Sequence, residues 1–184
     1  KDTSYFTPAR SLPDNIKYVL TLDADTRLPL FSVAALVGKA IHPLNRPVYS
    51  RRNGHVVSGY SILQPRVTPS LTTGAEASAF QRTFSANRGF DPYVFTVSDF
   101  YQDLVGEGSF TGKGLYDVDA FEMTMNGRIA ENTVLSHDLL EGSYARCALV
   151  TDVEFVEDFP VRYQVEVSRQ HRRARGDWQL LPFI

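Results

Sequence analysis

Cysteine is rare in this chain, and its scarcity already excludes several classes of protein. Cys147 is the one cysteine among 184 residues, which rules out an internal disulfide and a cysteine-rich zinc site. No apolar run approaches the roughly 18 residues needed to span a bilayer, and no signal peptide pattern is present. A strong excess of either charge is lacking as well, since 19 Lys and Arg residues against 21 Asp and Glu residues give a net charge of −2. Whole-chain charge therefore gives no nucleic-acid footprint.

What remains is the composition of a folded protein, 43% hydrophobic and 22% charged. Residues 1–16 read as an approach loop. The pattern predicts three strands, at 18–22 (a buried one), 55–67 (closing at Pro65) and 149–156. It predicts helices from Pro29 to about Ile41, and at 71–87, 117–125, 136–145 and 161–175. The first helix should bury one face, formed by Leu30, Val33, Leu36, Val37 and Ile41. Alternating strands and helices favour the α/β class, a mixed sheet with flanking helices on both faces.

Two carboxylates follow the first predicted strand. Asp23 and Asp25 are separated by one alanine and stand where the strand ends. Ligands of open α/β sheets bind at this edge, and such a pair suits a divalent cation that also bridges a diphosphate. A turn or a helix cap is the alternative interpretation, because a short acidic pair occurs often by chance.

A glycine-rich segment and a helix start carry the next candidates. Residues 106–116 hold four glycines in nine positions, a pattern that lets backbone amides contact a sugar or a phosphate; an ordinary turn is the alternative. The segment matches neither a Walker loop nor a dinucleotide fingerprint. Ser136 is the expected N-cap of the following helix. Asp138 in its first turn is stabilised by the helix macrodipole, and serves either as a cap or as a general base.

The last predicted helix is basic. Its five arginines face a single acidic residue, Glu166, and they are Arg162, Arg169, Arg172, Arg173 and Arg175. Arginine forks bind phosphate oxygens. A solvated face, an anionic lipid surface and a nucleic-acid contact are the alternatives, and the acidic remainder of the chain speaks against nucleic acid. The four histidines are too scattered for a zinc motif.

Taken in order, these motifs resemble a known family. Three pieces are similar to inverting glycosyltransferases of the GT-A type and to processive β-glycan synthases: Leu22-Asp-Ala-Asp25, Ser136-His-Asp-Leu-Leu-Glu-Gly142, and Gln170-His-Arg-Arg173 followed by Trp178. A closer resemblance is to the glycosyltransferase domain of cyclic β-1,2-glucan synthases. It rests on Gly112-Lys-Gly-Leu-Tyr-Asp-Val-Asp119, Leu135-Ser-His-Asp-Leu-Leu-Glu-Gly142 and Arg175-Gly-Asp-Trp-Gln179.

The resemblance implies an enzyme that transfers glucose from UDP-glucose to a growing β-1,2-glucan chain. Asp138 would be the general base, and Mg²⁺ or Mn²⁺ would sit on Asp25. The remaining roles divide between donor and acceptor: Asp23, Arg172 and Arg173 would bind the donor or its diphosphate, and Gly112, Lys113 and Trp178 would bind the acceptor. The signature tryptophan position holds Ala174, so Trp178 would take over the stacking role.

The resemblance also implies an incomplete domain. Residues 1–184 would be the second half of a GT-A-type glycosyltransferase domain, since few residues precede Asp23. The longer protein would be embedded in the bacterial inner membrane with this domain on its cytoplasmic face, whereas the 184 residues themselves should be soluble. Alone they should fold, self-associate and lack transferase activity, with no nucleic-acid partner. The alternative function is a non-catalytic module that binds a nucleotide or a polysaccharide.

Overall fold

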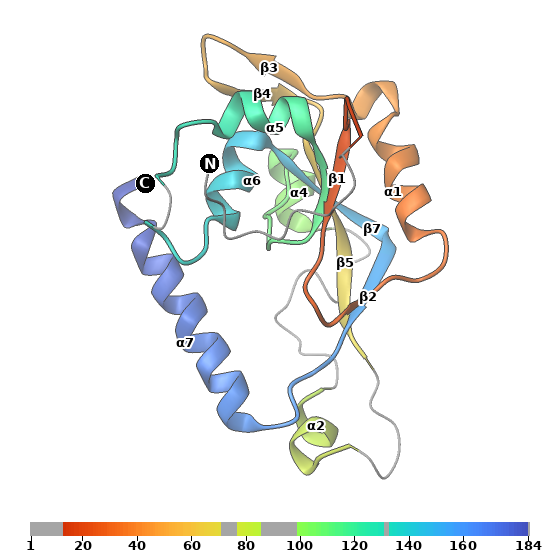
Figure 1. Ribbon diagram of the computed structural model, residues 1–184, viewed down its shortest axis with the longest axis vertical. Helices are drawn as coiled ribbons and strands as arrows, with labels where there is room; N and C mark the ends of the chain where they lie inside the picture. The colour runs from red at the N-terminus through yellow and green to blue at the C-terminus, as the bar shows by residue number, and fades with distance from the viewer. Residues whose placement is uncertain (1–12, 71–76, 86–98, 131–132, 184) are drawn as a thin grey trace.

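The structure is a computed structural model that describes residues 13–70, 77–85, 99–130 and 133–183 (Figure 1). Its centre is a five-stranded sheet in the order β1-β6-β5-β7-β2. The strands are β1 (Tyr18–Thr21), β6 (Gly114–Asp117), β5 (Ile62–Pro69), β7 (Cys147–Glu157) and β2 (Thr26–Arg27). β5 and β7 are parallel and the other pairs are antiparallel. The predicted mixed sheet of an α/β protein is confirmed.

Helices cover both faces of this sheet, as predicted. α1 (Ser32–Ala40) lies on one side, and α5 (Val118–Met125) and α6 (Asp138–Ala145) lie on the other (Figure 1). Neighbouring residues of a strand point to opposite faces, so the central strands contribute to two separate cores. The core beneath α1 contains Leu36, Leu63, Leu115, Ala148 and Phe155. The core on the other face contains Ile62, Phe110, Tyr116, Ala145 and Cys147.

The first strand and helix differ from the prediction in burial and in start. β1 was expected to be buried, which is wrong: it forms an edge of the sheet, and Val19 is 43% exposed. The helix expected from Pro29 begins at Ser32, since Phe31 before it adopts a left-handed conformation. Leu36 is fully buried as expected, but Leu30, Val33 and Ile41 are exposed. Leu30 and Ile41 lie outside the helix, whereas Val33 lies in its first turn.

The strand expected over residues 55–67 is in fact two strands. β4 (His55–Ser58) pairs with β3 (Val48–Ser50) in a small separate sheet, and Gly59 then turns the chain toward β5. Gly59 has φ +65°, and a Cβ there would clash with the Arg46 carbonyl oxygen. The prediction of a single strand is therefore wrong. One glycine is enough to make this turn, and a lone glycine does not interrupt the sequence pattern visibly.

β5 also runs past Pro65, where the sequence predicted its end. Pro65 pairs with Val150, and the next residue, Arg66, pairs with Glu154. β7 thus has three extra residues, 151–153, between the partners of two consecutive β5 residues, Pro65 and Arg66. Proline has no N–H to donate and is tolerated at such an irregularity.

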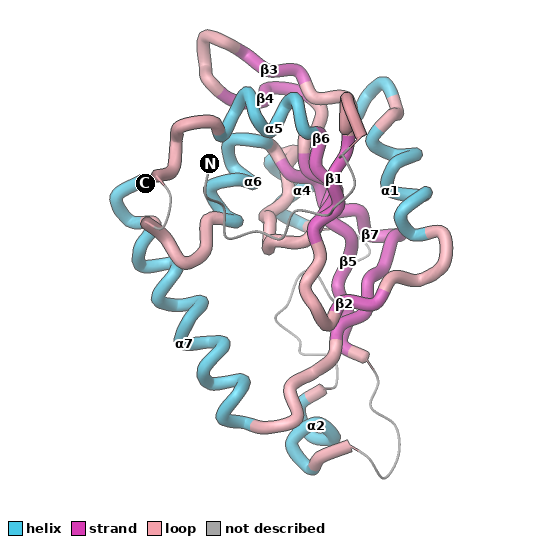
Figure 2. The backbone as a smooth tube through the Cα atoms, viewed as in Figure 1, coloured by secondary structure: helices cyan, strands magenta, loops and turns pink. Residues whose placement is uncertain are grey.

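The described residues also form three further helices, α2 (Ala79–Phe84), α4 (Phe100–Val105) and α7 (Tyr163–Gln179) (Figure 2). Two short 3-10 turns are η1 (Pro43–Asn45) and η2 (Leu181–Phe183). Of the helix predicted at 71–87, α2 is the described helical part, and 71–76 and 86–87 lie outside the described residues. The same holds for 1–12 of the approach loop, while residues 13–16 are neither helix nor strand. None of the described helices combines the length and apolar character that crossing a bilayer requires.

Candidate functional site

A cavity of about 540 Å³ brings together polar candidates from three sequence motifs, namely Lys113, Asp138 and Arg173. Its walls come from the glycine-rich segment, the start of α6, the end of β7 and one face of α7. Its polar lining includes Lys113, Ser136, Asp138, Glu157, Arg169 and Arg173. Segments far apart in the chain thus meet at one cavity.

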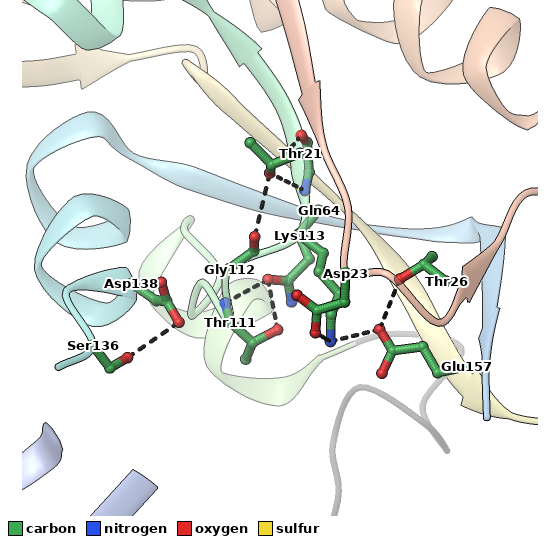
Figure 3. A network of polar contacts seen from close by, with 11 residues as sticks. Thr21, Asp23, Thr26, Gln64, Thr111, Gly112, Lys113, Ser136, Asp138 and Glu157 are labelled. Atoms are coloured by element: carbon green, nitrogen blue, oxygen red, sulfur yellow. Dashed lines mark hydrogen bonds and ion pairs between the residues drawn. The ribbon is translucent and has the colours of Figure 1, made fainter. Parts of the chain in front are cut away.

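The glycine-rich segment is held in place from the sheet. The side-chain oxygen of Gln64, a fully buried residue of β5, accepts hydrogen bonds from the Thr111 amide (2.7 Å) and hydroxyl (3.1 Å). The Thr21 hydroxyl at the end of β1 donates to the Gly112 carbonyl oxygen at 3.2 Å (Figure 3). Gly112 has φ +96°, a conformation that favours glycine. These contacts fix the backbone that carries Lys113.

Lys113 joins the glycine-rich segment to the acidic pair. Its ammonium lies 3.2 Å from an Asp23 carboxylate oxygen and 2.6 Å from Glu157 Oε1, and its side chain is only 8% exposed (Figure 3). The Thr26 hydroxyl donates to the same Glu157 oxygen at 3.2 Å. Glu157 is the last residue of β7 and stands in none of the motifs that the sequence indicates.

Three carboxylates come together at this point. Asp23, Asp25 and Glu157 each have an oxygen within 4.8 Å of the others. Carboxylate oxygens are the hard ligands that Mg²⁺ and Mn²⁺ prefer, so the donor set fits the cation that the family resemblance implies. The sequence identified two of the three carboxylates.

Asp138 is at the first residue of α6 and faces the cavity. The expected N-cap, Ser136, is wrong by one residue: His137 occupies the cap position and makes no side-chain cap bond. Instead, the Ser136 hydroxyl donates to Asp138 Oδ2 at 3.2 Å. Burial raises the pKa of the Asp138 carboxyl above its usual value and the nearby Glu141 charge adds to this, while Ser136, His137 and Lys113 oppose the rise.

A second polar chain supports the start of α6. His137 Nδ1 lies 2.6 Å from Glu141 Oε1, one helical turn away, and the Tyr116 hydroxyl donates to Glu141 Oε2 at 3.1 Å. The hydrogen bond to Glu141 raises the pKa of His137. The spacing of His137 and Glu141 was visible in the sequence, but the part that Tyr116 plays depends on the fold.

The basic helix α7 presents one face to the cavity. The residues on that face recur every three or four positions: Glu166, Arg169, Gln170, Arg173 and Asp177. A helix turns by about 100° per residue, so the side chains of the neighbouring residues Arg172 and Arg173 leave the helix in different directions. Among the described residues, Arg173 lines the cavity and Arg172 does not. The diphosphate-binding role of both stays a prediction.

α7 is anchored to the loop before α6 near its C-terminal end. Gly176 is its one buried residue, and a Cβ there would lie 3.0 Å from the Ser136 Cβ. The Gln179 side-chain oxygen accepts from the Leu135 amide at 2.8 Å. Trp178, between these two contacts, is 73% exposed and lies outside the cavity wall. Its stacking role also stays a prediction.

An aromatic group lies at the other end of α7. Phe80 of α2 packs against three rings, those of Phe84, Phe159 and Tyr163, at centroid distances of 5.1, 5.6 and 5.9 Å. Phe84 and Phe159 also line the cavity. Nothing in the local sequence indicates that these two rings, one at the end of α2 and one shortly before α7, would meet at the cavity.

Comparison with known proteins agrees with the resemblance in the sequence. No family model matches the chain. Over all 184 residues, however, the chain is 71% identical to part of the cyclic beta-(1,2)-glucan synthase NdvB of Rhizobium meliloti (strain 1021). The chain spans about 6% of the length of that protein. The predicted similarity to cyclic β-1,2-glucan synthases is therefore confirmed.

Proposed function

We propose that this chain is part of a glycosyltransferase domain that transfers glucose from UDP-glucose to a growing β-1,2-glucan. The observation that carries the proposal is its 71% identity, over its full length, to part of a cyclic beta-(1,2)-glucan synthase. The cavity supports it independently, because the half-buried Asp138 and the cationic side chains of Lys113 and Arg173 line it together with Glu157, one of the three clustered carboxylates. We assign the fold to the second half of a GT-A-type domain.

Asp138 is the proposed general base. The acceptor hydroxyl gives its proton to the Asp138 carboxylate as its oxygen bonds to the anomeric carbon of glucose. The bond from that carbon to the diphosphate oxygen breaks in the same displacement, and UDP leaves with the electron pair. A carboxyl whose pKa is raised by burial accepts a proton more readily than an exposed one, which suits this role.

Asp23, Asp25 and Glu157 are the residues that would hold Mg²⁺ or Mn²⁺. The bound cation would supply Lewis-acid neutralisation of the leaving diphosphate. Lys113 and Arg173 line the same cavity and add positive charge near that group. The guanidinium of Arg173 offers paired N–H donors to phosphate oxygens.

The acceptor would lie against the glycine-rich segment at Gly112 and Lys113. Phe84 and Phe159 give the cavity an aromatic wall suited to the apolar face of a sugar ring. Trp178 lies outside this wall, and its proposed contact with acceptor glucose is therefore to a more distant unit of the chain.

The test is glucan synthesis from labelled UDP-glucose by the complete native polypeptide that carries this chain. Asp138→Asn should lower the rate about 100- to 10,000-fold, the usual effect of removing a general base. Asp152→Asn is the matched control, since Asp152 is an exposed residue paired with Lys39. Retention of more than half the rate by Asp138→Asn would remove Asp138 from the mechanism. UDP binding without any transfer by the wild type would favour the non-catalytic module.

A further inference from the structure

Lys113 occupies a place that a surface lysine does not. Its side chain is 8% exposed, and its ammonium lies between Asp23 at 3.2 Å and Glu157 at 2.6 Å. These two residues are also members of the three-carboxylate group with Asp25. The lysine therefore already holds a positive charge against two of the oxygens that a divalent cation would need.

Charge balance explains why a lysine is placed there. Three carboxylates within 4.8 Å of one another repel, and a single ammonium reduces three negative charges by one. The ammonium therefore relieves part of this repulsion while no cation is bound. An ammonium and a cation cannot share the same oxygens without repulsion, so occupancy by one disfavours the other.

We propose that Lys113 is the internal counter-ion of the candidate cation site and is displaced from Asp23 and Glu157 when a divalent cation binds. This inference rests on the proposed function, since it assigns a residue to the cation site of that function. Lys113 also lines the cavity, so the released ammonium stays beside the space that an anionic ligand would fill. One residue then neutralises the carboxylates in the empty state and the phosphate group in the loaded state.

Replacement of Lys113 should change Mn²⁺ affinity and pyrophosphate affinity in opposite directions. Lys113→Met should strengthen binding of Mn²⁺ alone by at least about fivefold, the factor that corresponds to two unit charges about 4 Å apart in water. In the presence of saturating Mn²⁺, the same variant should bind inorganic pyrophosphate more weakly than the wild type. If Lys113 only stabilised the fold, Lys113→Met would weaken both Mn²⁺ binding and pyrophosphate binding.

The measurement is Mn²⁺ binding to the purified chain by electron paramagnetic resonance, followed by pyrophosphate titration. Lys113→Arg keeps the charge and should resemble the wild type. Asp23→Asn added to Lys113→Met should remove the gained affinity, which identifies the site. Unchanged or weaker Mn²⁺ binding by Lys113→Met overturns the proposal, as does a gain that Asp23→Asn leaves intact.

A second measurement needs no substitution and decides the question if Lys113→Met does not fold. Acetylation of the wild-type chain, followed by mass spectrometry, reports how accessible each lysine is. Mn²⁺ should raise labelling of Lys113 severalfold, relative to the exposed Lys17 and the half-exposed Lys39. Labelling of Lys113 that stays constant up to saturating Mn²⁺ would overturn the proposal. Glucan synthesis by Asp138→Asn is scored separately, so either hypothesis can fail alone.

Discussion

Gly112 lies directly against the carboxylate of Asp138. A Cβ at residue 112 would be 3.0 Å from Asp138 Oδ2 and 3.2 Å from its carboxyl carbon. Two residues 26 positions apart in the sequence therefore lie in contact beside the cavity, and the absence of a side chain at residue 112 sets where the proposed base stands.

Gly112→Ala tests this contact. The φ of +96° makes any side chain costly, by about 1–2 kcal/mol of unfolding free energy, and the new methyl presses on Asp138. Misplacing a reacting group lowers a rate by up to about 100-fold, so glucan synthesis should fall by about 10- to 100-fold. Gly38→Ala is the control, because a Cβ at that helical position meets nothing within 4 Å. It should stabilise the chain by about 0.5–1 kcal/mol. Equal activity of the two variants would contradict the proposed contact.

Asp138→Asn should also change stability with pH. Burial raises the pKa of Asp138 in the folded chain, so folding favours the protonated form. That contribution is complete below the pKa of an unfolded aspartate, about 3.9, and is lost as pH rises through the folded value. At neutral pH the wild type therefore carries an unfavourable buried charge, and Asp138→Asn should melt at a higher temperature. The difference should shrink toward acid pH. Asp152→Asn should give no such trend in calorimetric melts; a variant at residue 138 that melts lower at neutral pH would refute the argument.

His137 should contribute in the same pH direction for a different reason. Its hydrogen bond to Glu141 raises its pKa, so the pair stabilises the fold fully below the unfolded pKa of about 6.5. The stabilisation is lost as pH rises through the higher folded value. His137→Ala should therefore lower the melting temperature more at about pH 5.5 than at about pH 8.5. Glu141→Gln should remove the same pH dependence, and a pH-independent effect of His137→Ala would argue against the pairing.

The cation site predicts an order among carboxylate variants. Asp25→Ala should raise the Mn²⁺ concentration needed for half-maximal glucan synthesis by at least about tenfold, and more than Asp23→Ala does, because Asp23 already shares its charge with Lys113. Glu157→Gln should raise it as well. Glu154→Gln in the same strand is the matched control, since Glu154 pairs with Arg66 and Thr68. Equal Mn²⁺ titrations for wild type and Asp25→Ala would exclude Asp25 as a ligand.

Trp178 allows a clean measurement because it is mostly exposed. Trp178→Ala should change the unfolding free energy by no more than about 0.5 kcal/mol. If the ring stacks on acceptor glucose, the variant should lose about 2- to 10-fold in acceptor affinity, the usual value of an aromatic contact, and Trp178→Phe should keep most of it. Unaltered affinity in Trp178→Ala would end the stacking assignment.

Local pattern predicted the class of fold but not its sheet order. The helices α5, α6 and α7 and the strand β1 follow from the local sequence pattern, and the Asp117 side chain caps α5. β6 was missed because Gly114 lowers the strand tendency of its segment. That strand forms because β1 and β5 pair with it on both sides, and Gly114 fits there because a Cβ would lie 2.8 Å from the Leu63 carbonyl oxygen.

The candidate site divides in the same way. Asp23, Asp25 and Asp138 stand in recognisable motifs, whereas Glu157 is an ordinary glutamate at the end of a strand. Its meeting with Lys113 and Asp23 depends on pairings between residues that are far apart in the chain. Nothing in the local sequence around Glu157 or Gln64 indicates these partners.

The three extra residues of β7 determine how far that strand reaches. Counted from the pair of Pro65 with Val150, a regular strand would carry Glu157 three residues past Pro69, its present partner. At about 3.3 Å per residue, this is about 10 Å farther along the sheet. Residues 151–153 take up that length, and the Glu157 carboxylate ends beside Lys113 instead. A deletion within 151–153 would therefore move a proposed cation ligand without altering any residue of the cavity, so the number of extra residues in β7 is a direct way to adjust the site.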